Sequence, residues 1–149
     1  METKLKGDIA EQAVVFFALK FGWAVLKPIG DRLPYDLVFD INGKLVKIQV
    51  KAAWFDQQKQ NFVVDNRRTK TNRKIMKRES YCLHDFDFAV IFIQEINGFY
   101  VFPNDVFISY GSEIHLIETT KRQRKPKSSA YKEVWHLIEQ WAVQAEMPE

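Results

Sequence analysis

The chain has 149 residues, the length of one domain, with 46% hydrophobic residues, 28% charged residues and a formal net charge of +3, so it can bury a core and is not a disordered tail. Its apolar runs are far shorter than the roughly 18 residues that cross a membrane, and its start has no secretory signal pattern. The single cysteine, Cys82, excludes an internal disulfide and a cysteine zinc cluster. We therefore expect a cytoplasmic protein with one domain over residues 1–149.

The first predicted element is a helix over residues 7–21, where apolar residues recur at the spacing of a largely buried helix. Gly22 is placed to end this helix. A short strand is expected over residues 23–26. The two prolines and one glycine of residues 28–34 predict a loop, because they interrupt any regular element.

A β-hairpin is the most specific local prediction. Strand-like runs over residues 35–41 and 44–51 flank Asn42-Gly43, a pair that favours a type I′ turn because both central residues need positive φ. A two-residue turn determines the register, and a one-residue slip would move every side chain to the other face. The resulting register opposes three apolar pairs, which are Phe39 with Val46, Leu37 with Ile48, and Tyr35 with Val50.

The other face of this hairpin carries polar side chains with a shared chemistry. Asp36 is predicted opposite Gln49, and Lys51 lies two residues beyond Gln49 on the same face. Directly paired Cβ atoms are about 4.5–5.5 Å apart and diagonal ones about 7–8 Å apart. Carboxylate and amide oxygens can bind Mg²⁺, which lowers the pKa of a bound water, and a lysine stabilises negative charge on a phosphate. The set therefore predicts phosphodiester hydrolysis.

The remaining elements complete a mixed architecture. Strands are predicted over residues 61–65 and, as a buried apolar run, over 88–94. Asn97-Gly98 predicts a second hairpin turn into a strand over 99–102, which Pro103 ends. A final helix is predicted over 130–145, with Trp135 and Trp141 packed on the core. The order helix, sheet, helix predicts an α/β (α+β) domain around a mixed sheet.

These motifs resemble a known enzyme group. Pro34-Tyr35-Asp36, followed after twelve residues by Gln49-Val50-Lys51, is similar to the motif of the PD-(D/E)XK nuclease superfamily, which includes restriction enzymes, Holliday-junction resolvases and homing endonucleases. Residues 7–11 resemble the start of the first helix of that fold, where a glutamate often joins the metal site. The similarity covers residues 7–54 and is greatest to the intron-encoded homing endonucleases. It implies a restriction-endonuclease-like fold, with helices flanking a central mixed sheet.

The resemblance also implies the roles of individual residues. The implied catalytic residues are Glu11, Asp36, Gln49 and Lys51, and the implied metal ligands are Glu11, Asp36, Gln49 and the backbone carbonyl of Val50. The implied cofactor is Mg²⁺, for which Mn²⁺ can substitute. Gln49 departs from the family pattern, in which Asp or Glu is usual. An amide oxygen adds no charge, so metal binding is weakened unless Glu11 compensates.

Simpler interpretations stand beside these roles. Glu11 near a helix N-terminus is commonly only a favourable partner of the helix dipole. Asp36 and Lys51 could form an ordinary cross-strand ion pair on a solvated face. Residues 84–87 contain one histidine and two aspartates, which suggests a second metal site, but a polar loop is the preferred interpretation. His115 and His136 are interpreted as structural.

Basic residues are concentrated in two segments, 67–78 with seven and 121–127 with five, and the first segment contains no acidic residue. A charge run is usually a solvated face, but this density inside one domain favours a polyanionic partner. We expect double-stranded DNA, held by salt-dependent phosphate contacts and read partly by arginine and asparagine in the major groove, where a two-stranded ribbon fits. The predicted DNA-binding residues are Asn66, Arg67, Arg68, Lys70, Asn72, Arg73, Lys74, Lys77, Arg78, Lys121, Arg122, Arg124, Lys125 and Lys127.

The predicted function is that of a site-specific homing endonuclease that makes a double-strand break. One small domain carries one active site, and two cuts require at least a symmetric dimer. A homing enzyme also reads a long site, so we expect a homodimer or a dimer of dimers without a membrane association. Two alternatives remain open: a structure-specific nuclease of the Holliday-junction type, and a DNA-binding module that has lost catalysis through Gln49.

Overall fold

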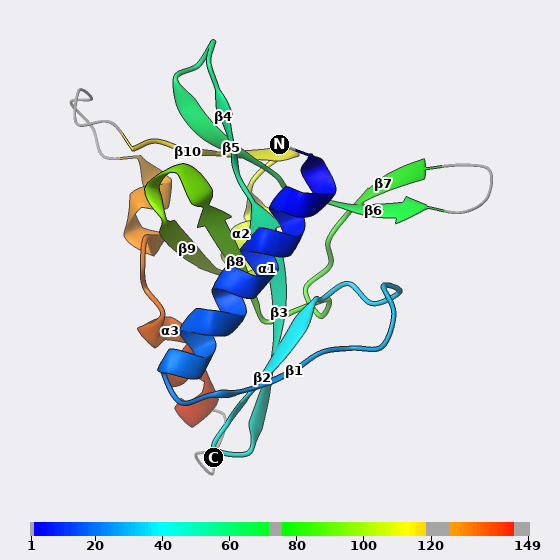
Figure 1. Cartoon of the computed structure of the whole chain (residues 1–149), viewed down its shortest axis with the longest axis vertical. Coiled ribbons are helices and arrows are strands. Elements are labelled where there is room, and N and C mark those ends of the chain that lie inside the picture. Colours follow the sequence, from blue (N-terminus) through cyan, green and yellow to red (C-terminus); the bar gives the residue numbers. More distant parts are fainter. Residues whose placement is uncertain (1, 72–75, 119–125, 145–149) are drawn as a thin grey trace.

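The computed structural model describes residues 2–71, 76–118 and 126–144, with the backbone alone over 68–71 and 76–78 (Figure 1). Its centre is a five-stranded sheet in the order β1-β2-β3-β8-β9. β3 and β8 run parallel and the other neighbours run antiparallel, so the sheet is mixed, as predicted. The strands are β1 (Ala24–Leu26), β2 (Leu37–Ile41), β3 (Lys44–Ala52), β8 (Phe88–Ile93) and β9 (Gly98–Pro103).

Two smaller sheets and several helices complete the described fold. One small sheet has the order β10-β5-β4, and the other is a two-stranded ribbon of β6 and β7 that projects from the body (Figure 1). Their strands are β4 (Trp54–Asp56), β5 (Asn61–Asp65), β6 (Arg67–Thr71), β7 (Met76–Ser80) and β10 (Glu113–Leu116). The helices are α1 (Thr3–Lys20), α2 (Asn104–Ser109) and α3 (His136–Gln144), with 3₁₀ turns η1 (Gln94–Ile96) and η2 (Lys127–Tyr131).

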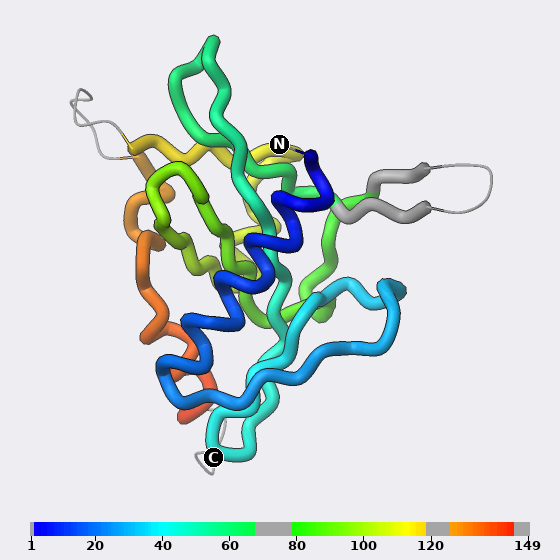
Figure 2. The backbone as a smooth tube through the Cα atoms, viewed as in Figure 1, coloured from blue at the N-terminus to red at the C-terminus, as the bar shows by residue number. Residues whose placement is uncertain are grey.

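The first helix crosses one face of the central sheet diagonally, as the backbone trace in Figure 2 shows. Ala10, Val14 and Ala18 are four residues apart and form its buried stripe. The helix ends at Lys20, and Gly22, with φ of 83°, donates its N–H to the carbonyl of Leu19. The predicted helix is therefore confirmed, although it begins four residues earlier. Among the described residues, no helix is both long and apolar enough to cross a bilayer.

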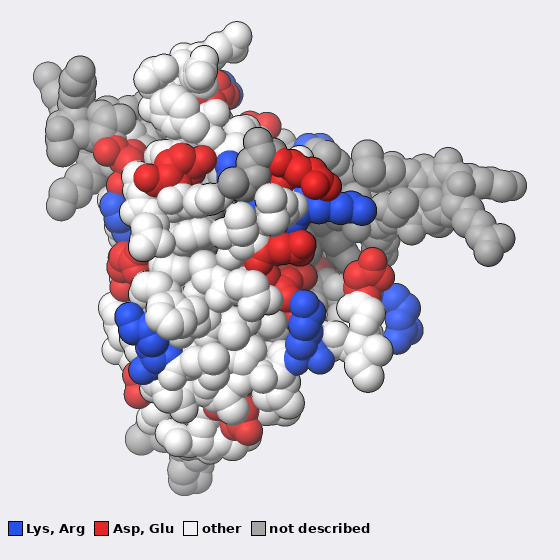
Figure 3. All heavy atoms as spheres, viewed as in Figure 1, with Lys and Arg blue, Asp and Glu red and all other residues white. Residues whose placement is uncertain are grey.

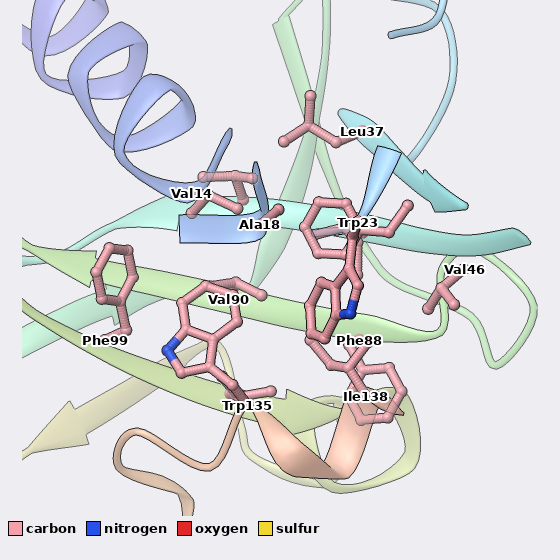
Figure 4. Packing of buried hydrophobic residues seen from close by; sticks show 14 of the residues in the cluster. Val14, Ala18, Trp23, Leu37, Val46, Phe88, Val90, Phe99, Trp135 and Ile138 are labelled. Carbon is pink, nitrogen blue, oxygen red and sulfur yellow. The ribbon is translucent and has the colours of Figure 1, made fainter. Parts of the chain in front are cut away.

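The hydrophobic core lies on both faces of the central sheet. Successive side chains of β8 alternate between two clusters, so that Phe88, Val90 and Phe92 belong to one and Ala89 and Ile91 to the other. Both clusters are apolar, which explains why this strand is a continuous apolar run. Figure 4 shows the first cluster, in which residues of α1, the sheet and the C-terminal segment meet. Trp135 and Trp141 join this first cluster, as predicted.

The first hairpin has the predicted register. Asn42 and Gly43 have φ of 53° and 91°, and Leu37 pairs with Ile48 and Phe39 with Val46. One part of the prediction is wrong, because the ladder starts at Leu37 and does not pair Tyr35 with Val50 or Asp36 with Gln49. The chain leaves the ladder before Leu37 because the Asp36 side chain itself accepts the N–H of Val50, at 2.8 Å.

The second hairpin forms where it was predicted, but its turn comprises other residues than Asn97-Gly98 alone. β8 and β9 pair antiparallel, with Ile93 opposite Gly98, so the connection includes the 3₁₀ turn η1 and Asn97. Asn97 has φ of 50° and ends that turn, whereas Gly98 is already in the strand. The predicted hairpin is therefore confirmed, with a connection over residues 94–97. Pro103 is the last residue of β9, as predicted.

The C-terminal segment is not the continuous helix that its apolar spacing predicted. A 3₁₀ turn ends at Tyr131, and α3 begins only at His136. Between them, Lys132 forms a bridge to Tyr100 and the N–H of Glu133 donates to the carbonyl of Phe99 at 2.9 Å. Glu133 has φ of 55°. Pairing with the edge of β9 thus interrupts the helix, and this long-range contact has no signal in the local pattern.

Candidate active site

Asp36 lies in the loop directly before β2 and is half-buried. Its backbone N–H donates to the carbonyl of Ile48 at 2.8 Å, which ties the loop to β3. Its carboxylate Oδ2 accepts the N–H of Val50 at 2.8 Å and the amide Nε2 of Gln49 at 3.0 Å. The loop and strand β3 therefore bring the predicted ligands Asp36, Gln49 and Val50 into direct contact.

Burial raises the pKa of the Asp36 carboxyl above its ordinary value of 3.8. The N–H of Val50 opposes this increase, and the nearby charge of Glu11 adds to it. Lys51 and Lys27 act in the opposite direction and lower the pKa. Ionisation of Asp36 is therefore unfavourable, because the group is buried and lies near the carboxylate of Glu11. A bound cation would stabilise the ionised form.

Gln49 is 8% exposed and connects two of the predicted ligand oxygens. Its Nε2 lies 3.0 Å from Asp36 Oδ2 and 3.2 Å from the backbone carbonyl of Val50. The amide nitrogen of Gln49 therefore donates to both the Asp36 carboxylate and the Val50 carbonyl. The amide oxygen of the same side chain is a ligand that suits a hard cation. These donors fit a divalent metal ion that takes oxygen ligands.

Glu11 lies on α1 beside this group, and its side chain is 19% exposed. Its carboxylate forms an ion pair and hydrogen bond with Lys27, which follows β1. The same hydrogen bond raises the pKa of Lys27. No group of three or more His, Cys, Asp or Glu side chains is arranged for a metal in the described part of the chain. Glu11 and Asp36 are the two carboxylates of the predicted set.

Lys27 is a site residue that the sequence prediction missed. A single lysine at the start of a loop carries no recognisable pattern, and its proximity to Glu11 and Asp36 results from the path of the loop after β1. Figure 3 shows acidic and basic side chains alternating along the right-hand side of α1. The Lys27–Glu11 ion pair places one positive and one negative charge close to Asp36.

Lys51, the predicted catalytic lysine, lies at the edge of the same group. Its Nζ donates to the backbone carbonyl of Arg67 at 3.0 Å and lies 5.0 Å from the centre of the Tyr81 ring. Its positive charge is close enough to Asp36 to lower the pKa of that carboxyl. Lys51 and Asp36 therefore interact electrostatically, although the strand ladder between β2 and β3 begins only at residue 37.

A cleft of about 600 Å³ opens beside this lysine. Its walls come from the start of α1, the end of β3, and the β5–β10 sheet. The residues that line it include Lys6, Val50, Lys51, Trp54, Asp65, Arg67 and Glu113. Arg67 Nε pairs with Asp65 Oδ1 at 3.2 Å in this cleft. Two of the predicted site residues, Lys51 and Arg67, therefore line a cleft that opens to the outside, whereas Val50 is only 9% exposed.

Asn66 is a correction to the predicted DNA-binding set. It is 5% exposed, and its Nδ2 donates to the carbonyls of Phe107, Tyr110 and Gly111 at 2.7, 3.3 and 3.1 Å. The amide ties β5 to the segment after α2, so it cannot contact a base. Polar composition alone did not distinguish this buried structural role from a surface role.

The other predicted DNA-binding residues are described to different extents. Arg67 is partly exposed, and exposed Lys127 places its Nζ 5.0 Å from the centre of the Tyr110 ring. For some residues the structure describes only the backbone of the ribbon, namely Arg68, Lys70, Lys77 and Arg78. The remaining ones lie outside the described residues, namely Asn72, Arg73, Lys74, Lys121, Arg122, Arg124 and Lys125.

The segment 84–87 has a structural role, as preferred in the sequence interpretation. Phe86 is fully buried, and the two aspartates accept backbone N–H groups, Asp85 from Cys82 at 2.7 Å and Asp87 from Lys47 at 2.8 Å. Their oxygens hold the loop together. His115 likewise contacts Asn61 at 3.4 Å.

Comparisons with known proteins identify the family of this chain. The model of the PD-(D/E)XK endonuclease family matches residues 1–138. The chain is also similar to the solved structure of the bacterial homing endonuclease I-Ssp6803I, with 61% identity, coverage of 99% of this chain and 100% of that chain, and a TM-score of 0.89. MepB has 12% identity and a TM-score of 0.45 over 89% of this chain and 93% of its own. No curated protein matches. Residues that cover nearly the whole chain thus carry the resemblance first suggested by residues 7–54, and the chain belongs to the PD-(D/E)XK endonuclease family.

Proposed function

We propose that this protein is a site-specific homing endonuclease that hydrolyses phosphodiester bonds of double-stranded DNA and makes a double-strand break. The observation that carries the proposal is the contact of Asp36 with Gln49 and Val50, beside Lys51. The similarity over the whole chain to a bacterial homing endonuclease supports the same activity. The protein is expected to act inside the cell, where its DNA substrate lies.

The proposed cofactor is Mg²⁺, for which Mn²⁺ substitutes. Asp36 and Glu11 would supply carboxylate oxygens, Gln49 its amide oxygen, and Val50 its backbone carbonyl. When bound, the metal lowers the pKa of a water molecule and stabilises negative charge on the phosphate. Lys27 already pairs with Glu11, so a bound metal would replace the Lys27 ammonium as the cationic partner of this carboxylate.

Lys51 is the proposed catalytic lysine. Its ammonium orients the attacking water and stabilises the negative charge that develops on the scissile phosphate. The cleft beside it admits the DNA backbone, since Lys51, Arg67 and Lys6 line its wall. The charge of Lys51 favours the carboxylate form of Asp36, against the larger effect of burial, which raises the pKa of this group.

The ribbon of β6 and β7 is the proposed principal DNA-binding element. It projects from the body next to the active site (Figure 1), and the segment 67–78 carries seven basic residues. A two-stranded ribbon has the width of the major groove. Phosphate contacts from this segment, and from 121–127, make the affinity fall steeply with salt.

The decisive experiment incubates the purified chain with a random duplex library, a four-way junction and increasing Mg²⁺. We expect cleavage of selected duplex sequences, and loss of cleavage but retention of binding in Lys51→Ala, by roughly 10²–10³-fold if the lysine contributes as other charge-stabilising groups do. Preferred cutting of the junction would instead indicate a structure-specific nuclease. Tight binding without cutting in Mg²⁺ or Mn²⁺ would indicate an inactive DNA-binding module.

A further inference from the structure

Tyr81 is a buried aromatic residue that directly follows the ribbon. It is 7% exposed, and its ring packs edge-on against Phe86, with the ring centres 5.1 Å apart, and against Phe107 at 6.2 Å. Phe86 and Phe107 are themselves fully buried and pack on each other at 5.7 Å. The position of the Tyr81 ring is therefore held by the second hydrophobic cluster.

The ammonium of Lys51 makes two contacts at the base of the ribbon, one with the first residue of β6 and one with the residue after β7. Its Nζ donates to the carbonyl of Arg67, the first residue of β6, and lies over the ring of Tyr81, the residue after β7. Arg67 and Ser80 are paired across the ribbon, so these two contacts come from neighbouring points.

We infer that Tyr81 is a positioning residue for the proposed catalytic lysine. A lysine head group sits on a flexible four-carbon stem and adopts many orientations unless other groups hold it. The face of an aromatic ring attracts a cation through its quadrupole, and the ring here cannot move away because Phe86 and Phe107 hold it. The interaction needs the ring and not the hydroxyl group. This inference rests on the proposed function of Lys51.

The arrangement also connects DNA binding to catalysis. The ribbon that carries the basic segment 67–78 supplies, at its base, two groups that contact the head group of Lys51. A displacement of the ribbon on DNA therefore changes the surroundings of this lysine directly. Tyr81 contributes to the reaction through Lys51 and not through contact with the substrate.

The test measures single-turnover cleavage and binding separately for variants of the full chain. The substrate is a duplex selected by cleavage of the random library, held at saturating concentration with Mg²⁺. Tyr81→Leu and Tyr81→Met remove the aromatic face, and we expect the cleavage rate to fall about 10- to 30-fold while the dissociation constant for DNA changes less than about twofold. Tyr81→Phe keeps the ring and restores most of the rate.

Phe102→Leu is the matched control. Phe102 is fully buried in the same cluster as Tyr81, so its substitution lowers the thermal stability to a similar extent without removing a contact to Lys51. An equal loss of rate in Phe102→Leu, or failure of Tyr81→Phe to restore the rate, overturns the inference. If Lys51→Ala cleaves normally, the proposed function of Lys51 fails. If that variant is inactive and both Tyr81→Leu and Tyr81→Met cleave normally, only the positioning role fails.

Discussion

The pKa of the Asp36 carboxyl depends on its burial and on four neighbouring groups. Burial and Glu11 raise this pKa, whereas the N–H of Val50 and the charges of Lys51 and Lys27 lower it. The folded protein therefore binds this proton more tightly than the unfolded chain. The stability contribution of the group is greatest below the ordinary carboxyl pKa and declines as the pH rises through the raised folded value. Ionisation of Asp36 thus lowers the stability of the metal-free protein, and the proposed function requires this ionised group.

Asp36→Asn tests this cost. At pH 8 we expect the metal-free variant to unfold at a temperature no lower than that of the unsubstituted protein. Above the ordinary carboxyl pKa, its stability should decrease less with increasing pH. Cleavage is abolished, because the amide cannot supply the negative charge for the metal. Thermal unfolding followed by circular dichroism in EDTA, at several pH values, measures the effect. A variant several degrees less stable at pH 8 would contradict it.

Lys27 provides a second test at the residue scale. Its ammonium neutralises Glu11 and also reaches Asp36. We expect Lys27→Met to reduce the Mg²⁺ concentration for half-maximal cleavage about three- to tenfold, because removing one nearby positive charge favours a competing cation.

The control for Lys27→Met is Lys20→Met, which removes the same charge from the end of α1, where Lys20 Nζ lies over the rings of Phe16 and Phe17. Mg²⁺ titration of cleavage measures the metal requirement of both variants. If this requirement changes equally in Lys27→Met and Lys20→Met, the effect is a general charge effect and not local competition.

At the scale of elements, the β2–β3 hairpin determines where the site forms. The turn places Asn42 and Gly43 in the left-handed region, and the N–H of Gly43 donates to Asp40 Oδ1 at 2.8 Å. Glycine adopts this backbone conformation without the steric cost that a Cβ introduces. The register set here places Gln49 and Lys51 on one face of β3, next to Asp36.

Gly43→Ala measures the contribution of the turn. A Cβ at this position meets no atom within 4 Å, so the backbone conformation alone is tested. We expect the free energy of unfolding from urea denaturation to fall by about 1–2 kcal/mol. The control is Gly111→Ala, which also has open space and has no positive φ, and its effect should stay within about 0.5 kcal/mol. Equal losses in both variants would remove the special role of the turn.

At the scale of the whole molecule, one site per chain requires partners for a double-strand break. We expect a dimer or a dimer of dimers in sedimentation experiments, and direct conversion of a supercoiled single-site plasmid to the linear form, because two sites act in one bound complex. Long accumulation of nicked circles by a sedimenting monomer would contradict this assembly. The same plasmid assay with Lys51→Ala controls for contaminating nucleases.

The sequence by itself determined the features that depend on local chemistry. The family and the mixed sheet were predicted and confirmed, and so was the register of the first hairpin. That register was predictable because positive φ at Asn42 and Gly43 is a property of two adjacent residues. The predicted proximity of Asp36 and Gln49 followed from it, with the pairing detail corrected, since Asp36 contacts β3 through its side chain.

Only the tertiary structure decided the features that depend on distant partners. The helix break at Glu133 arises from pairing with β9, and the burial of Asn66 arises from three carbonyls near α2. Lys27 joined the site because the loop after β1 brings it to Glu11, and Tyr81 met Lys51 at the base of the ribbon. Each of these contacts joins residues far apart in the chain. Their energies come from burial and hydrogen bonds that no local window contains.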